Sequence, residues 1–232
     1  MRKLCALPLL LLLLPAAALH AQEYGVAAHV SALLPVGGMA DRFKPAAGGG
    51  LSFTLHRGSP EWSGSIEYFR FGTPADRSIT RTVTDSSSGV EQAVVFPLEE
   101  LDMTFKAWGA SATASWGLFT LGPVDARLSL TLGFYRWSFV RAAYTDSLYA
   151  DVGGTTVLAD VLNVPESSQG EWSGGFAVGL DVVVPLFEPV YLSAGARYRT
   201  LIAELWPTLA LELESVSTIQ MVDLRAGLEV RW

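Results

Sequence analysis

The sequence predicts an all-β protein, an eight-stranded antiparallel up-and-down transmembrane β-barrel, on three observations. Half of the 232 residues are hydrophobic and only 17% are charged, yet beyond the N-terminus no stretch approaches the ~18 uninterrupted apolar residues of a membrane-spanning helix. Apolar and polar residues instead alternate with the period of two that is typical of β-strands. The connections between these strands alternate between short and long, which places turns and loops at opposite ends of a barrel.

The first segment has the features of a secretory signal peptide. Arg2 and Lys3 precede an apolar run that ends in small residues, the usual order of such signals. We predict a signal peptide over residues 1–21 and a barrel domain over residues 22–232. The single cysteine, Cys5, falls in the signal, so the exported chain would contain no thiol.

The charge of the exported chain excludes a nucleic-acid partner. Removal of the two basic residues at the N-terminus leaves 14 of the 16 basic residues against 23 acidic ones, a net charge near −9. Nucleic-acid binding requires a concentrated basic surface, and the sequence contains no such cluster.

Eight runs of alternating residues follow the signal, each long enough for a short barrel strand. The run around Leu128, Leu130 and Leu132, with Ser129 and Thr131 between them, is typical. The alternation slips near Ala107, where we predict a β-bulge. The runs cover residues 24–34, 51–55, 62–68, 108–116, 128–134, 176–184, 190–198 and 222–232.

The connections support this count of strands. Short links fall at Arg57–Pro60, around Gly122 and Pro123, and at Phe187–Pro189. The long links cover residues 35–47, 72–100, 141–170 and 207–217. Residues 78–96 alternate around a Ser/Gly-rich centre, which predicts a hairpin that continues the third and fourth strands as a ribbon beyond the bilayer. With an even number of strands, both ends of the barrel domain would lie on the periplasmic side.

Alternation alone also fits a soluble barrel of the lipocalin type, which is apolar inside. The polar positions favour the membrane alternative, because they are rich in Gly, Ser, Ala and Thr, which suit a narrow lumen. Charges at these positions have both signs, so they could neutralise one another inside the barrel. The predicted luminal charge network consists of Glu67, Arg127, Asp181, Arg197, Arg199, Asp223, Arg225, Glu229 and Arg231.

Aromatic residues bracket the apolar positions. Trp108 and Trp116 share one strand face eight residues apart, which at ~3.3 Å per residue and ~40° tilt separates them by about 20 Å along the membrane normal. This distance suits two interfacial girdles, although tryptophans packed in a core remain the alternative. The predicted membrane-interface aromatics are Tyr24, Trp62, Trp108, Trp116, Tyr198 and Trp232.

The C-terminal residues 222–232 alternate apolar side chains and end on Trp232. Together with Leu34–Gly38 and the Gly-led run at residues 48–51, this segment resembles the superfamily of small outer-membrane β-barrel proteins that includes the OmpA transmembrane domain, OmpX and OmpW. The resemblance implies a place in the bacterial outer membrane, contact with lipid and lipopolysaccharide, and recognition of the C-terminal strand by the barrel-assembly machinery. It also implies that some members act as surface binders, pass small apolar solutes or modify lipid A.

The sequence predicts no catalytic residue, no cofactor and no metal ion. His29, near Ser31 in the lumen, and His56, near a turn, are the histidines of the barrel domain, and neither is placed for a Ser-His-acid triad. The loop acids Asp146, Asp151, Asp160, Glu166 and Glu171 are spread out, so we expect them to solvate the loop. We therefore expect a monomer with a structural or surface-interaction role in its long loops. The alternatives are a narrow channel for small or apolar solutes and, less favoured, a lipid A-modifying enzyme.

Overall fold

The computed structural model describes residues 24–84, 89, 91–98, 101–152 and 154–232. In this part of the chain there are thirteen β-strands and two short 3-10 helices. Neither helix has the length and hydropathy needed to cross a bilayer. The predicted signal peptide lies outside the described residues.

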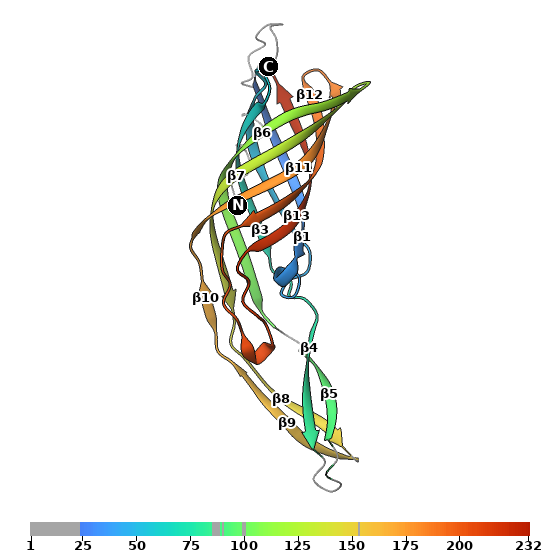
Figure 1. Cartoon of the computed structure of the whole chain (residues 1–232), viewed down its shortest axis with the longest axis vertical. Coiled ribbons are helices and arrows are strands. Elements are labelled where there is room, and N and C mark those ends of the chain that lie inside the picture. Colours follow the sequence, from blue (N-terminus) through green and yellow to red (C-terminus); the bar gives the residue numbers. More distant parts are fainter. Residues whose placement is uncertain (1–23, 85–88, 90, 99–100, 153) are drawn as a thin grey trace, which may run out of the picture.

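Eight antiparallel strands close into a barrel (Figure 1), which confirms the predicted fold class. β1 pairs with β13 on one side and β2 on the other, and β7 pairs with both β6 and β11, so the barrel sheet has no open seam. The barrel strands are β1 (Tyr24–Val36), β2 (Ala46–Leu55), β3 (Glu61–Phe71), β6 (Met103–Leu121), β7 (Val124–Arg141), β11 (Trp172–Phe187), β12 (Val190–Leu201) and β13 (Ile219–Arg231).

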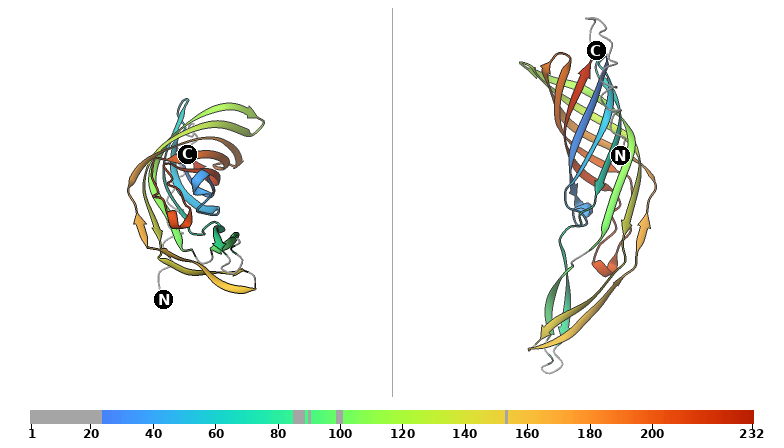
Figure 2. Two further views of the ribbon diagram at one scale, coloured as in Figure 1. Left: turned by 60° about the horizontal axis from the view of Figure 1, so that its bottom comes forward. Right: turned by 180° about the vertical axis from the view of Figure 1, so that it is seen from behind.

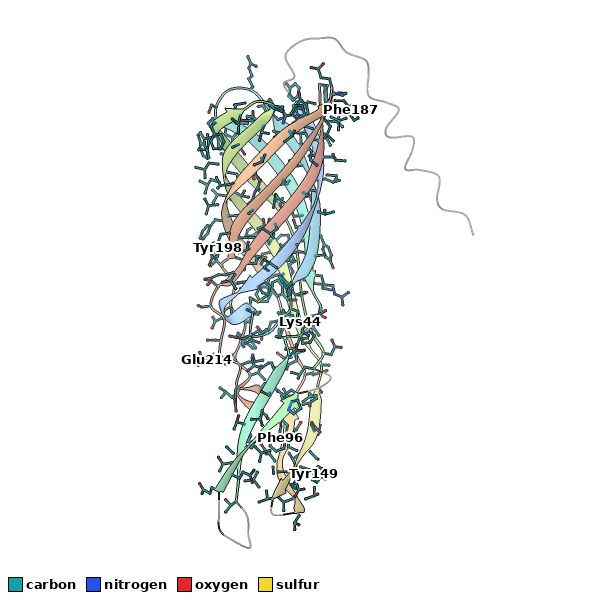
Figure 3. The ribbon with its side chains drawn as sticks, turned by 90° about the vertical axis from the view of Figure 1, so that its right-hand side faces the viewer. Lys44, Phe96, Tyr149, Phe187, Tyr198 and Glu214 are labelled. Atoms are coloured by element: carbon teal, nitrogen blue, oxygen red, sulfur yellow. The ribbon has the colours of Figure 1, made fainter. Side chains whose placement is uncertain are left out.

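The two ends of the barrel differ as predicted. The short connections, residues 56–60, 122–123 and 188–189, lie at what we call the turn end, which is marked by Phe187 in Figure 3. Tyr24 and Trp232 exchange two backbone hydrogen bonds of 3.2 and 3.0 Å, so β1 begins where β13 finishes, also at this end. All four long connections leave the opposite end, which we call the loop end.

The β-bulge predicted near Ala107 is wrong. β6 and β7 pair without interruption from Met103 to Gly117, and the register shift falls between Gly117 and Phe119, beside the turn. Met103, Phe105 and Ala107 are fully buried and have the same parity as the inward-facing Gly109. Inward-facing residues of β6 are thus apolar near the loop end and small or polar towards the turn end. In the sequence, this change looks like a shift of the apolar residues from one strand face to the other.

The long connections form a folded extension beyond the loop end (Figures 1 and 2), which we define as the described parts of residues 37–45, 72–102, 142–171 and 202–218. The predicted hairpin in residues 72–100 is present, but it forms a sheet of its own, not a continuation of β3 and β6. A second, unpredicted hairpin lies beside it, with β9 against β4 and β8 against β5. The elements of the extension are η1 (Gly37–Met39), β4 (Arg77–Thr84), β5 (Glu91–Leu98), β8 (Tyr144–Val152), β9 (Thr155–Val164), β10 (Ser167–Gln169) and η2 (Leu209–Leu211).

One hydrophobic core joins the barrel to the extension. It begins inside the loop end with Phe69, Phe105 and Trp137 and continues between the hairpins, where Ile79 and Leu162 are buried. Apolar burial of this extent stabilises the arrangement by roughly 1.5–3 kcal/mol for each large side chain. The extension is therefore packed onto the barrel by the same forces that hold an ordinary domain together.

Candidate functional site

A closed set of four charges occupies the middle of the lumen. Arg199 donates hydrogen bonds to Glu67 (2.8 Å) and to Asp223 (2.9 Å). Arg225 bridges the same two carboxylates, at 2.6 Å from Asp223 and 3.3 Å from Glu67. The Tyr135 hydroxyl adds a donor to Glu67 at 3.2 Å. Two cations and two anions neutralise one another here, which is the condition under which buried charges are tolerated.

Two further groups of charges lie nearer the turn end. Arg197 donates to Asp181 at 2.8 Å. A Cβ at Gly195 would collide with this carboxylate, so glycine is what leaves room for it. At the mouth of the barrel Arg127 pairs with Asp125 at 2.6 Å and with Glu61. The structure thus places all nine residues of the predicted network inside the barrel, in ion pairs that also involve Glu61 and Asp125.

His56 links two carboxylates at the turn end of the lumen. Its Nδ1 lies 2.8 Å from Glu61 and its Nε2 lies 2.6 Å from Glu229, and Glu229 also accepts from Arg231 at 2.8 Å. A neutral imidazole has only one N–H, so it could donate to only one carboxylate. The geometry therefore suits the doubly protonated, cationic form. The sequence places His56 near a turn but does not indicate this bridge, because His56 and Glu229 are 173 residues apart in the chain.

The bridge makes the stability of the protein depend on pH. His56 lies in the turn after β2; burial lowers its pKa, but the hydrogen bonds with Glu229 and Glu61 outweigh this and leave the pKa above the usual 6.5. A group with a raised folded-state pKa stabilises fully below its unfolded value, and this stabilisation is lost as the pH rises through the folded value. We expect the free energy of unfolding of the wild type, relative to His56→Gln, to decrease as the pH rises from 6 towards 9.

Urea unfolding of the protein refolded in detergent, followed by tryptophan fluorescence, measures this difference. Glu61, Glu229, Arg127 and Arg231 also contribute to the pH dependence of the free energy of unfolding. Because these residues are present in both proteins, the comparison with His56→Gln subtracts the part that does not involve the imidazole. A difference between the two proteins that is constant over this pH range would show that His56 is not charged in the folded barrel.

The lumen contains a polar cavity in its half near the turn end and is filled by aromatic side chains near the loop end. A cavity of about 100 Å³ lies in the half near the turn end, lined by His29, His56 and Arg225 among others. Towards the loop end, Phe105 stacks on Trp137 with ring centroids 5.8 Å apart and on Phe69 at 6.3 Å. These buried rings occupy the interior where a solute would have to pass.

The outer wall of the barrel is apolar. Exposed side chains such as Leu51, Ile66 and Leu132 cover it. Five of the six predicted interface aromatics are exposed and Trp116 is half-buried. Tyr24, Trp62, Trp116 and Trp232 lie towards the turn end, and Trp108 and Tyr198 lie towards the loop end.

Two aromatics that sequence analysis missed join the outer ring at the loop end. Trp172 packs edge-on against Trp108 at 5.2 Å and stacks on Phe134 at 5.2 Å. Trp108, Arg136 and Trp172 are aligned across three neighbouring strands. Aromatic rings at both rims of an apolar band are typical of a barrel that sits in a bilayer.

Arginine side chains hold the extension together from within. Arg42 is fully buried and donates to the carbonyl oxygens of Trp206 (3.1 Å) and Glu214 (2.7 Å). Burial, with the neighbouring Arg141 and Arg77, lowers the pKa of Arg42 to about 10, so this residue stays charged at neutral pH. Arg81 ties the hairpins to each other through Asp160 at 2.8 Å and to η2 through Glu212 at 2.7 Å.

The candidate catalytic and metal-binding residues lie apart from one another. His29 lies 3.7 Å from Glu67, inside the charge network. Asp160 is paired with Arg81, and Asp146 accepts from the Tyr144 hydroxyl at 3.0 Å. Within the described part of the chain, no three His, Cys, Asp or Glu side chains come together as metal ligands would.

The fold and its two faces define the class of protein. A closed antiparallel barrel with eight strands, an apolar outer wall between aromatic rings, and short turns at one end is the architecture of outer-membrane β-barrel proteins,.

Comparison with known proteins finds solved structures of low sequence identity. No protein-family model matches the chain, and no curated protein matches it. Among solved structures the chain is similar to Neisserial surface protein A, with 17% identity, a TM-score of 0.46, and coverage of 90% of this chain and 97% of that one. It is similar to Ail, the attachment invasion locus protein of Yersinia pestis (12%, 0.39, 90% and 96%). It is also similar to a major outer membrane protein from Thermus thermophilus (9%, 0.49, 90% and 99%).

Proposed function

We propose that the chain is an integral protein of the bacterial outer membrane whose extension binds a partner at the cell surface. The observation that carries this proposal is the packed, preformed extension. Ile79 and Phe96 of one hairpin and Leu148 and Leu162 of the other are buried in a core that is continuous with the barrel. Loops that merely connect strands have no need of a shared core, whereas a rigid surface lowers the entropic cost of binding.

The proposal includes the route to this location. Residues 1–21 would direct export and be removed, and the barrel-assembly machinery would recognise the C-terminal strand that ends in Trp232. The outer wall would contact lipid and lipopolysaccharide, with the extension outside the cell and the barrel as a monomer. No catalytic role is part of the proposal: His56 bonds with the carboxylates of Glu61 and Glu229, and His29 lies beside Glu67.

Deletion of the hairpins tests the binding role. We expect a variant in which Gly-Ser links replace residues 77–98 and 144–164 to assemble in the outer membrane but to lose attachment to surfaces. Removing the whole hairpins leaves β6 and β7 paired along their full length, so the barrel should persist. The measurement is attachment of cells that produce each protein to a panel of immobilised matrix and serum proteins.

Heat-modifiable mobility on a gel provides the control for assembly. Equal attachment by wild-type and hairpin-deleted cells, with both barrels folded, would refute a binding role for the hairpins. A control variant, in which Arg57 in the turn between β2 and β3 is changed to Ser, should attach like the wild type because it alters the opposite end.

The channel alternative leads to a distinct prediction. Because Phe69, Phe105 and Trp137 fill the lumen at the loop end, we expect planar-bilayer recordings of the wild type to show no stepwise ion conductance. Eight-stranded barrels are in general just wide enough to be filled by their own side chains. Reproducible single-channel current steps from the purified wild type would contradict this prediction and support the channel function.

A further inference from the structure

The extension contains an open pocket at the loop end of the barrel. Its volume is about 350 Å³, and it lies between the chain around β10 and the segment that follows β12. This volume falls within the range usual for sites that take small ligands or side chains. The lining residues are Trp137, Ser168, Gln169, Gly170, Glu171, Glu204 and Trp206.

The walls of the pocket are fixed in position. The Trp206 amide donates to Oε1 of Gln169 at 3.2 Å, which ties one wall to the other. The Trp137 amide donates to the Glu171 carbonyl at 3.0 Å, and the Trp137 indole donates to Ser173 at 2.9 Å. A Cβ at Gly170 would lie 2.7 Å from the Trp137 carbonyl oxygen, so only glycine lets this wall approach β7 so closely.

The chemistry of the lining favours a cation. Trp206 is 62% exposed, although a residue of this size would normally be covered, and it lines the pocket together with Glu171 and Glu204. The lining contains no Lys or Arg. An aromatic face beside carboxylates is an arrangement that attracts ammonium and guanidinium groups.

The two connections that form the pocket are acidic in composition. They cover residues 142–171 and 202–218 and contain eight acidic residues and no basic one. Arg42 is buried in the core and donates to the carbonyl oxygens of Trp206 and Glu214. Arg81 pairs with two of these acidic residues, Asp160 and Glu212. A surface of one sign raises the local concentration of oppositely charged partners and their rate of association.

We propose that this pocket receives the Arg or Lys side chain of a partner protein. The inference rests on the proposed binding function and names the chemistry of the partner. The guanidinium or ammonium group lies against the Trp206 indole and is neutralised by Glu171 and Glu204, and Gln169 positions Trp206. A protein is favoured over lipopolysaccharide because the phosphate groups of that lipid would meet this acidic surface with the same sign of charge.

The test uses the full barrel domain refolded in detergent and a blocked Gly-Arg-Gly peptide as the probe. The readout is the NMR signal of the Trp206 indole N–H, assigned by its loss in Trp206→Phe. We expect the peptide to shift this signal in a saturable manner, and we expect the double variant Glu171→Gln/Glu204→Gln to bind about tenfold more weakly. The paired control is Glu166→Gln, an exposed acidic position in the same connection but outside the pocket, which should bind as the wild type does.

Three outcomes would overturn the proposal. One is an unchanged Trp206 signal at saturating peptide. Another is a loss of affinity in Glu166→Gln as large as in Glu171→Gln alone, which would indicate diffuse attraction only. The third is a larger shift with glucosamine than with the peptide, which would assign the pocket to an amino sugar. Because attachment of hairpin-deleted cells is measured separately, a failed pocket and a failed binding function give different results.

Discussion

Replacing Asp223 with asparagine is expected to lower the free energy of unfolding by about 3–5 kcal/mol, the usual cost of removing one partner from a buried ion pair. Asp223 is fully buried and accepts from both Arg199 and Arg225. Without it, two guanidinium groups share the single carboxylate of Glu67. Arg199 is almost fully buried, so the excess positive charge would lie in a part of the lumen that is poorly solvated.

A double variant separates loss of charge balance from loss of shape. Asp223→Asn combined with Arg225→Met removes one charge of each sign, so we expect it to be less destabilised than the sum of the two single variants. Urea unfolding in detergent at constant pH measures all four proteins, with the exposed Asp151→Asn as a control for the chemical change. Strict additivity would show that the two residues do not interact in the folded barrel.

The barrel was predictable because its two faces differ in polarity over most of each strand. Leu128, Leu130 and Leu132 face lipid while Ser129 and Thr131 face the lumen, and a period of two then indicates a strand directly. The prediction failed where both faces are apolar. At Met103–Ala107 the inward residues join the core, so hydropathy no longer distinguishes the faces and the true register shift at residues 117–119 was missed.

The extension was only partly predictable, because its order comes from contacts between connections that are distant in the sequence. Residues 144–164 alternate much as residues 78–96 do, with Leu148, Ala150 and Val152 buried. The sequence nevertheless predicts a long loop over residues 141–170, and we expect its scattered acidic residues to solvate it. The partner of residues 144–164 is the other hairpin, and the ion pair of Arg81 with Asp160 joins positions 79 residues apart.

The charge network shows the same limit. The inward-facing charges could be picked out by parity, but their pairing depends on closure of the barrel. Arg127 reaches Glu61 across 66 residues, and no local pattern specifies that contact. A usable local signal did exist, since Asp125 and Arg127 stand two residues apart on one strand face with opposite charge, as Asp223 and Arg225 do.

Truncation of Phe105 to alanine is expected to destabilise the protein by about 3–5 kcal/mol, the range for deleting a large aromatic from a core. Phe105 is fully buried and has ring contacts with Phe69, Phe71 and Trp137 at 5.8–6.3 Å. It lies where the barrel interior meets the extension, so the cavity should also loosen the hairpins. We expect protease sites in residues 144–164 to become accessible while the barrel strands stay protected.

Phe134 provides the matched control, because it is the same residue type on the neighbouring strand but points outwards, with 56% of its side chain exposed. Phe134→Ala removes the same atoms from the lipid-facing wall and leaves no internal cavity, so it should cost far less. Urea unfolding and limited proteolysis in one detergent compare the two variants. If Phe105→Ala and Phe134→Ala lowered the free energy of unfolding by equally small amounts, the aromatic residues at the loop end would not form a hydrophobic core. The proposed binding function, which depends on a rigid extension, would then lose its structural support.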